Sequence, residues 1–242
     1  MENKRSTPEE ILAGKTRRAF VALGIGGAAA VGGFAWLVSR PEVDGIPGPF
    51  RKGFAFNEGA VRNALYSNNH LAPTFPVSAV TEQKSNGMEG QEDELDGAWQ
   101  LEVGDRKLSL EDLKTLPRVE QTTEFKCVEG WSAISRFAGV RLADFTAKFA
   151  PGGEKSAYVG MKTPDGLYYV GLDMPSAMHP QTLLAWEMNG EPLTDDHGAP
   201  LRLVIPVKYG IKNIKRIGKI WYSSERPADY WAERGYDYYS GL

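Results

Sequence analysis

The chain has 242 residues, of which 42% are hydrophobic and 24% are charged. These fractions are typical of a globular protein and exclude disordered, collagen-like and multi-span membrane proteins. The formal net charge of −3 gives no overall attraction to nucleic acid. A single cysteine, Cys127, excludes an intramolecular disulfide and every zinc site that needs two or more thiolates.

Residues 20–38 form an apolar stretch without a charged residue, directly after Arg17 and Arg18. A stretch of about 20 apolar residues can span a bilayer as a helix, so we expect the chain to leave the cytoplasm. The residues Thr16-Arg17-Arg18-Ala19-Phe20 resemble the twin-arginine export signal, which serves proteins that cross the membrane folded. The alternative is an ordinary signal anchor whose arginines set only its orientation. No small-x-small cleavage site is clear, which favours retention as an anchor, and we assign residues 1–40 to a twin-arginine signal or membrane anchor.

Two loose segments separate this stretch from the folded body. Prolines and glycines between Pro41 and Phe50 predict an extended linker, 41–59, before a domain at 60–242. Residues 81–97 are rich in acidic residues and nearly free of apolar ones. They predict a solvated acidic loop or, alternatively, a docking patch for a basic redox partner.

The folded body combines short strands with few helices. Alternating apolar residues predict strands, and helical spacing or a Ser109/Asp112 capping pattern predicts helices. The expected strands are 99–103, 119–127, 157–161, 167–172, 201–205 and 217–222, with a hairpin over 185–193; the expected helices are 109–116, 142–149 and 176–183. No internal repeat is visible. The predicted class is α+β with a mainly β core.

Cys127 ends a predicted strand, and Val128-Glu129-Gly130-Trp131 follows it. Glycine lets the backbone turn sharply there, and a strand end is a place where a side chain can meet a ligand. The alternative is a buried structural cysteine.

A basic run covers residues 202–219, which contain Arg202, Lys208, Lys212, Lys215, Arg216 and Lys219 and no acidic residue. These groups could converge on one anion, most naturally a phosphate. A solvated basic face is the alternative, and a nucleic-acid surface is disfavoured because apolar residues alternate through the run. His197 stands just before this run, whereas the spacing of the three histidines supports no metal centre.

Four ordered segments, 125–131, 196–202, 206–215 and 224–231, resemble the molybdopterin domain of the sulfite oxidase family. The likeness covers roughly residues 60–240 and is closest to the molybdoenzyme subunits of periplasmic methionine-sulfoxide reductases. It implies a sulfite-oxidase-type α+β fold with a mainly β core, preceded by the N-terminal apolar helix. The implied cofactor is molybdopterin with molybdenum, and the implied activity is two-electron oxygen-atom transfer by an oxidoreductase.

The resemblance also assigns roles to residues. Cys127 becomes the thiolate ligand of molybdenum, which suits a soft sulfur donor. Tyr236 matches an active-site tyrosine near the metal oxo group, and we expect Trp131 to wall the pocket. The implied cofactor contacts are Asn68, His70, Cys127, Thr163, His197, Arg202, Asn213, Ile214 and Lys215. At His197 the sulfite oxidases have His, whereas the sulfoxide-reductase subunits tend to have Asn.

The residues after Cys127 depart from the sulfite oxidase pattern. Sulfite oxidases have Gly-Asn-Arg-Arg there, whose arginines help to hold sulfite, whereas this chain has Val128, Glu129, Gly130 and Trp131. An acidic residue near the metal disfavours an anion, so the expected substrate is an oxidised sulfur compound of the sulfoxide type, small or protein-bound. The alternatives are a sulfite dehydrogenase and a non-catalytic exported binding domain with the same fold.

The resemblance finally bears on partners and location. No Cys-x-x-Cys-His haem motif exists in the chain, so the electrons are expected from a separate redox partner, either a membrane b-type haem protein or a cytochrome c. Nucleic acid is not an expected partner. The expected location is the periplasm or the outer face of the cytoplasmic membrane, reached by the twin-arginine route.

Overall fold

The computed structural model describes residues 8–64, 70–87, 90 and 98–242. The predicted cofactor contact Asn68 and most of the acidic segment lie outside these residues. The chain divides into two compact units, residues 1–56 and 57–242, which are described separately.

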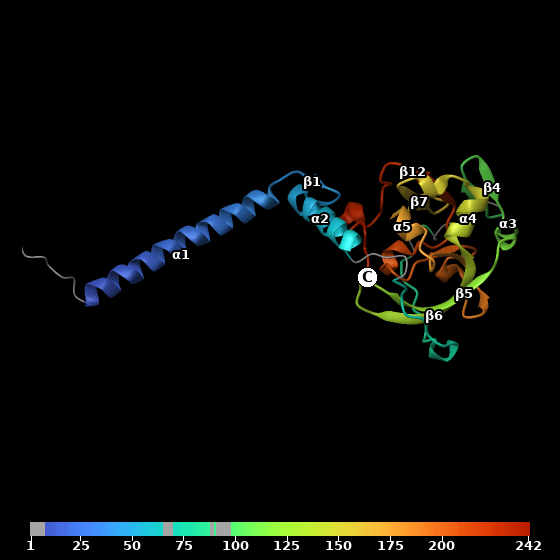
Figure 1. Ribbon diagram of the computed structural model, residues 1–242, viewed down its shortest axis with the longest axis horizontal. Coiled ribbons are helices and arrows are strands. Elements are labelled where there is room, and N and C mark those ends of the chain that lie inside the picture. The colour runs from blue at the N-terminus through green and yellow to red at the C-terminus, as the bar shows by residue number, and fades with distance from the viewer. Residues whose placement is uncertain (1–7, 65–69, 88–89, 91–97) are drawn as a thin grey trace, which may run out of the picture. The chain divides into compact units, whose positions relative to one another are not determined.

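The first unit is built on α1 (Pro8–Val38), the long helix of Figure 1. Within it, Leu12–Val38 is long and apolar enough to cross a membrane, with a mean hydropathy of 1.9. Large side chains such as Phe20, Leu23 and Phe34 are exposed along it. A signal sequence and a membrane anchor both have these properties.

The segment predicted as an extended linker is folded instead. Strands β1 (Glu42–Val43) and β2 (Ile46–Pro47) pair across a turn at Asp44 and Gly45, whose φ angles are both positive. Helix α2 (Gly48–Ala64) follows at once. A proline in the first turn does not break a helix, because its missing N–H has no acceptor there, so Pro49 is compatible with this start.

The second unit contains two five-stranded sheets among its described residues. The first has the order β10-β9-β6-β5, and β11 also pairs with β9. All its pairings are antiparallel. Its strands are β5 (Val119–Lys126), β6 (Ser132–Arg141), β9 (Leu183–Met188), β10 (Glu191–Pro192) and β11 (Arg202–Val204).

The second sheet has the order β4-β3-β12-β7-β8. Strand β12 runs parallel to β3 and antiparallel to β7. The strands are β3 (Leu101–Val103), β4 (Arg106–Leu108), β7 (Tyr158–Lys162), β8 (Tyr169–Asp173) and β12 (Lys219–Ser223).

Short helices join these strands. The α-helices are α3 (Leu110–Lys114), α4 (Leu142–Phe149) and α5 (Met174–Ala177). The 3-10 turns are η1 (Val77–Ala79), η2 (Gly153–Lys155), η3 (Asp195–His197), η4 (Gly210–Lys212) and η5 (Ala232–Arg234). The capping box predicted at Ser109 and Asp112 is confirmed, with Ser109 Oγ accepting from the Asp112 N–H at 3.2 Å.

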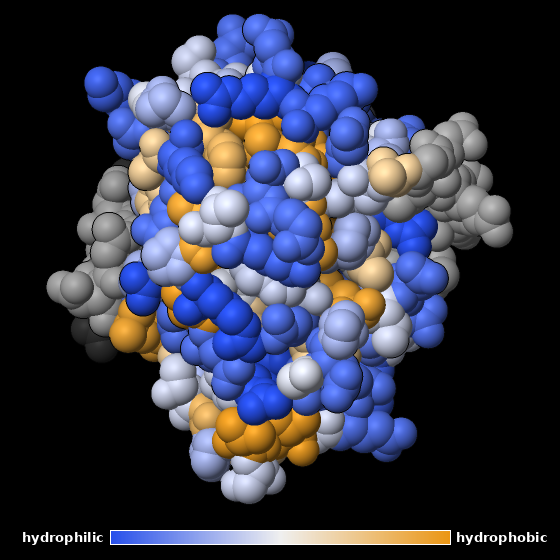
Figure 2. Space-filling model, turned by 90° about the vertical axis from the view of Figure 1, so that its right-hand side faces the viewer, coloured by the Kyte–Doolittle hydropathy of each residue, from blue (hydrophilic) through white to orange (hydrophobic). Residues whose placement is uncertain are grey.

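The main hydrophobic core joins both sheets and α4 in one cluster. Leu101 and Ile220 come from one sheet, Val140 and Leu184 from the other, and Phe145 from α4, and all are fully buried. The predicted α+β class with a mainly β core is therefore confirmed. On the face shown in Figure 2 the surface is mostly hydrophilic, with small separate hydrophobic patches.

Other sequence predictions also differ from the structure. The helix expected over 176–183 ends at Ala177, because Pro180 disfavours a helical His179 and the chain turns into β9 at Leu183. Strand β6, which carries small and polar residues between its apolar ones, was not predicted. It lies at the middle of its sheet, where a bulge at Ala138/Gly139 brings Gly139 so close to Leu184 that a Cβ would lie 1.9 Å from its carbonyl oxygen.

Candidate active site

Cys127 occupies the first position of the turn that joins β5 to β6. Its N–H donates to the Trp131 carbonyl at 2.9 Å, and its carbonyl accepts from the Gly130 N–H at 3.2 Å. Gly130 has a φ of 88°, which a glycine adopts without strain. The backbone of Cys127 is thus fixed by the hairpin, and its side chain, 8% exposed, borders a pocket.

This pocket has a volume of about 310 Å³, within the range of small-ligand sites. Its walls come from the β5–β6 turn, the loop after β11 and the C-terminal part of the chain. The lining residues are Asn86, Gly87, Phe125, Cys127, Val128, Glu129, Tyr168, Arg202, Gly210, Ile211, Asn213, Lys215, Trp231 and Tyr236. Of the predicted site residues, Cys127, Arg202, Asn213, Lys215 and Tyr236 therefore meet around one cavity.

Arg202 is the most deeply buried cation of the pocket. It is 4% exposed, and burial lowers the pKa of its guanidinium to about 10, so it stays charged at neutral pH. It donates to the carbonyls of His197, at 3.1 Å, and Asn213, at 3.5 Å, while its Nε has no partner among the described residues. No described carboxylate forms an ion pair with it. An anion that enters the pocket would therefore meet a buried positive charge that no carboxylate neutralises.

His197 lies beside Arg202 but lines a smaller neighbouring cavity of about 30 Å³. Burial, followed by the positive charges of Arg202 and Lys215, holds the pKa of His197 below its ordinary value. The imidazole is therefore neutral at physiological pH and can donate or accept one hydrogen bond.

The loop from Ile205 to Asn213 forms one wall of the pocket. Asn213 Oδ1 accepts from the Ile205 N–H at 2.8 Å, and its Nδ2 donates to the Tyr209 carbonyl at 3.2 Å. Asn213 thus ties the two ends of the loop together. Gly210 packs so closely on the Phe125 ring that a Cβ there would lie 2.5 Å from Cζ, which brings the loop against the end of β5.

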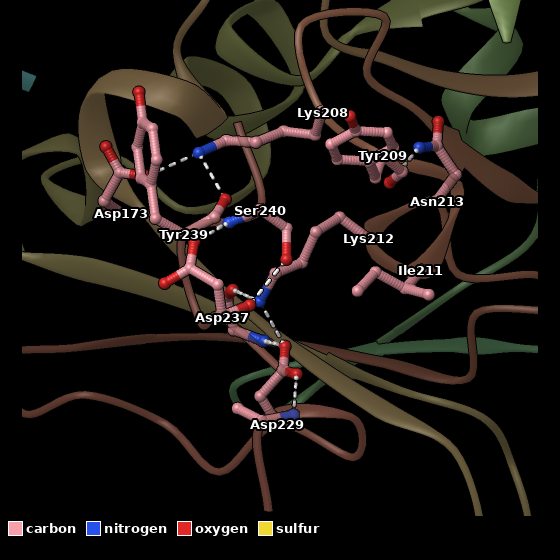
Figure 3. A network of polar contacts seen from close by, with 12 residues as sticks. Asp173, Lys208, Tyr209, Ile211, Lys212, Asn213, Asp229, Asp237, Tyr239 and Ser240 are labelled. Carbon is pink, nitrogen blue, oxygen red and sulfur yellow. Dashed lines mark hydrogen bonds and ion pairs between the residues drawn. The ribbon is translucent and has the colours of Figure 1, made fainter. Parts of the chain in front are cut away.

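The basic run does not converge on one site. Lys208 pairs with Asp173 and Lys212 with Asp229, each with a side-chain exposure of 4% or less, and both lysines point into this network in Figure 3. Arg216 pairs with Asp195 and Lys219 with Glu102. The carboxylates that pair with Lys208 and Lys212 are buried, whereas those that pair with Arg216 and Lys219 are exposed. Of the cations in this run, only Arg202 and Lys215 line the pocket.

Lys215 connects the pocket to residues 81–87, which we name the crossing segment. Its Nζ donates to Ser85 Oγ at 3.3 Å and to the carbonyls of Asn86, at 2.9 Å, and Gly87, at 3.2 Å. Asn86 and Gly87 are themselves lining residues. This part of the predicted acidic loop is therefore held against the site.

Aromatic side chains form the opposite wall. Tyr236 is 40% exposed and lies edge-on to Trp231, with ring centroids 5.0 Å apart. Tyr168 donates its hydroxyl to the Ile211 carbonyl at 2.6 Å. The aromatic rings of this wall can pack against an apolar part of a ligand.

Several predicted residues lie away from the pocket. Trp131 lines the smaller cavity, where its Nε1 donates to Glu129 Oε2 at 2.9 Å. Thr163 is buried and accepts from the Tyr168 N–H within the β7–β8 connection. Ile214 belongs to the hydrophobic core. His70 is exposed, and its carbonyl lies 3.3 Å from His179 Nε2.

The structure also adds residues that the sequence analysis did not assign to the site, chiefly Asn86, Glu129 and Trp231. Glu129 had a recognisable signal, since it stands two positions after the cysteine. Asn86 had none, because it reaches the site from a segment that is distant in sequence.

These residues fit a molybdopterin cofactor. Cys127 supplies one soft sulfur ligand, and Arg202 and Lys215 supply cations where a phosphate-bearing group would need them. The Arg202 Nε without a partner among the described residues is a donor that such a group can satisfy. When bound, the molybdenum centre supplies the two-electron redox change of an oxygen-atom transfer.

Comparison with known proteins finds similar sequences and a similar solved structure. A protein of Campylobacter jejuni named protein-methionine-sulfoxide reductase catalytic subunit MsrP is 30% identical over 98% of this chain and 83% of its own length. A protein of Azospira oryzae, provisionally named protein-methionine-sulfoxide reductase subunit YedZ1, is 36% identical over 75% of this chain and 72% of its own length. The crystal structure of the sulfane dehydrogenase SoxCD from Paracoccus pantotrophus is 20% identical, with a TM-score of 0.48 over 66% of this chain and 46% of that chain.

Residues 89–231 match the family described as the oxidoreductase molybdopterin binding domain. This match covers more than half of the chain and includes Cys127, Arg202, Asn213 and Lys215. The chain therefore belongs to the family of oxidoreductase molybdopterin binding domains.

Proposed function

We propose that this protein reduces a sulfoxide-type substrate outside the cytoplasm, using molybdopterin-bound molybdenum held by Cys127. The balanced reaction takes a sulfoxide, two electrons and two protons to a sulfide and water. The names of the MsrP relatives agree with this substrate class. The electrons come from a separate redox protein, for which a membrane b-type haem protein and a cytochrome c are the two candidates.

The observation that carries the choice of substrate is the position of Glu129. It lines the same pocket as Cys127, and its Oε2 accepts from Trp131 Nε1 at 2.9 Å and from Asn86 Nδ2 at 3.1 Å. A carboxylate beside the metal site repels sulfite and leaves a neutral sulfoxide unaffected.

The cations that could offset this repulsion are otherwise engaged. Lys126 pairs with Glu124 at 3.5 Å, and Arg136 pairs with Glu120 at 3.6 Å, and neither lines the pocket. Arg202 and Lys215 do line it, but they are the residues suited to the cofactor's anionic group. Among the described residues that line this pocket, no further cation is therefore left to bind sulfite.

Within the proposed site, the residues of this chain bind and position the cofactor and the substrate. Arg202 and Lys215 hold the anionic end of the cofactor, and Asn213 keeps the loop that carries Ile211 in place. In this proposal, Trp231 and Tyr236 flank the substrate, and the Tyr236 hydroxyl hydrogen-bonds a substrate oxygen atom or supplies a proton to it.

Paired steady-state assays test this function. The purified holoenzyme is given methionine sulfoxide with a reduced viologen dye, and sulfite with an artificial electron acceptor. We expect sulfoxide reduction, with sulfite oxidation weaker by orders of magnitude. Efficient sulfite turnover without sulfoxide reduction would assign the chain to sulfite oxidation instead. Wild-type protein without molybdenum, from a host that makes the cofactor, would favour a non-catalytic binding domain.

We also propose that residues 1–40 direct export by the twin-arginine route and that α1 remains as an anchor. The adjacent Arg17 and Arg18 before an apolar helix support this. Changing Arg17→Lys with Arg18→Lys keeps the positive charge and removes the guanidinium pair, so folded holoprotein should accumulate in the cytoplasm. Normal export of this double variant would favour an ordinary signal anchor.

A further inference from the structure

The crossing segment is fixed to the rest of the second unit by contacts on two sides. On one side, the Thr81 N–H donates to the Ile134 carbonyl at 3.1 Å, and Gln83 Nε2 donates to the same carbonyl at 3.1 Å. On the other side, Ser85 Oγ donates to the Asp196 carbonyl at 2.8 Å, and Lys215 binds the next two carbonyls. A segment held at both ends places the side chain between them reproducibly.

That side chain is Asn86, and its amide nitrogen meets two acceptors. Asn86 Nδ2 lies 3.7 Å from Cys127 Sγ and 3.1 Å from Glu129 Oε2. A primary amide carries two N–H donors on one nitrogen, so it can donate one hydrogen to each. A cysteine thiolate and a carboxylate only accept, which requires the amide to present its nitrogen rather than its oxygen to them.

The two hydrogen bonds that Asn86 donates have an electrostatic effect on the site. A metal-bound thiolate and the Glu129 carboxylate are both electron-rich, and they lie close together in a partly buried pocket. A neutral double donor between them stabilises both without adding a charge to the site. Hydrogen bonds to a ligating sulfur also reduce the electron density that it gives to its metal and thereby raise the reduction potential.

We propose that Asn86 is a positioning residue of the molybdenum site, which donates one hydrogen bond to the Cys127 sulfur and another to Glu129 and so sets the reduction potential of the metal. This inference rests on the molybdenum assignment made in the proposed function. It goes beyond that assignment because it gives a role to a segment outside the β5–β6 turn and the loop after β11.

The test compares three variants of the holoenzyme. Asn86→Ala removes both donors, and Asn86→Asp keeps the shape of the side chain but replaces the donors with a third anion. Ser85→Ala is the matched control, because it removes a hydrogen bond of the adjacent residue in the crossing segment, and Ser85 contacts neither Cys127 nor Glu129. For each protein we would measure molybdenum and pterin content, the melting temperature, the Mo(V) electron paramagnetic resonance spectrum, and the molybdenum midpoint potentials by redox titration.

We expect a graded result. Ser85→Ala should have the wild-type potentials and Mo(V) spectrum, Asn86→Ala should have lower potentials and an altered spectrum, and Asn86→Asp should have the lowest potentials. If the two Asn86 variants instead lose molybdenum while keeping the wild-type melting temperature, and Ser85→Ala stays fully loaded, the link from Asn86 to the metal ligand is also supported.

Two outcomes would overturn the proposal. Potentials and spectra that are unchanged in fully loaded Asn86→Ala and Asn86→Asp would show that the amide does not act on the sulfur. Equal losses of molybdenum and of melting temperature in all three variants would reduce the crossing segment to a structural element. A third outcome, wild-type protein that contains no molybdenum, would refute the proposed function as well. The first two outcomes refute only the role of Asn86, so the two failures can be told apart.

Discussion

Lys212 lies against Asp229 with both side chains almost fully buried, at 1% and 2% exposure. Lys212 Nζ also donates to the Gly171 carbonyl at 3.1 Å, and Asp229 Oδ2 accepts from the Gly171 N–H at 3.1 Å. This ion pair therefore joins the pocket loop to β8 and to the segment after β12 (Figure 3). It explains why a lysine of the basic run stabilises the wall of the pocket instead of binding a ligand in it.

Replacing this lysine should destabilise the protein strongly. Lys212→Met leaves Asp229 as a buried carboxylate without its cation, which costs about 3–5 kcal/mol. Denaturant unfolding would measure this loss. Lys219→Met is the matched control, because the pair of Lys219 with Glu102 is substantially exposed and contributes about 0–1 kcal/mol. Equal losses in the two variants would contradict the role given to burial.

Lys208 should make stability depend on pH. Burial lowers the pKa of Lys208 to about 7, although the nearby Asp173 carboxylate opposes that shift. The pKa returns to its ordinary value near 10.5 on unfolding, so between pH 7 and 10.5 the unfolded state binds more protons than the folded state. The free energy of unfolding should therefore rise with pH in this window, by at most about 1.4 kcal/mol per pH unit.

The variant Lys208→Met removes this proton uptake. Its free energy of unfolding, measured at several pH values between 7 and 9.5, should rise less steeply than that of the wild type. Parallel slopes for the two proteins would show that Lys208 titrates alike in the folded and unfolded states.

Arg202 should strengthen cofactor binding without stabilising the apoprotein. Arg202→Met removes charge-assisted contacts worth about 1.5–3 kcal/mol, so cofactor affinity should fall roughly tenfold to more than a hundredfold. The apoprotein should be as stable as the wild type or more stable, because a buried cation without a described carboxylate partner is lost. Pterin content and apoprotein melting temperatures check the two parts. Full pterin content would remove Arg202 from the cofactor site.

Cys127→Ser should fold and lose the metal's thiolate ligand. Serine keeps the size of the side chain in the fixed β5–β6 turn but offers a hard oxygen donor. We expect a melting temperature close to that of the wild type, a loss of the sulfur-to-molybdenum charge-transfer absorption and a loss of sulfoxide reduction. Turnover equal to that of the wild type would exclude Cys127 as the ligand.

The sequence by itself determined the α+β class, most of the strands and the position of Cys127 at the end of a strand. These features depend on local signals: the period-two alternation of β5, the capping box at Ser109 and a glycine turn after a strand. The ordered segments around Cys127, Arg202 and Asn213 also sufficed to indicate the family, because they lie in the part of the chain that the family match covers. Such signals are contained within a few residues of one another.

Only the tertiary structure decided which charged and polar groups face the pocket. Lys208, Lys212 and Lys215 look alike in one basic run, yet two of them are buried against Asp173 and Asp229, and the third reaches the crossing segment. Their carboxylate partners lie far away in sequence, and so do the acceptors of Asn86. Whether a lysine pairs within the core or faces a ligand depends on how distant segments pack, and for this the local pattern carries no signal.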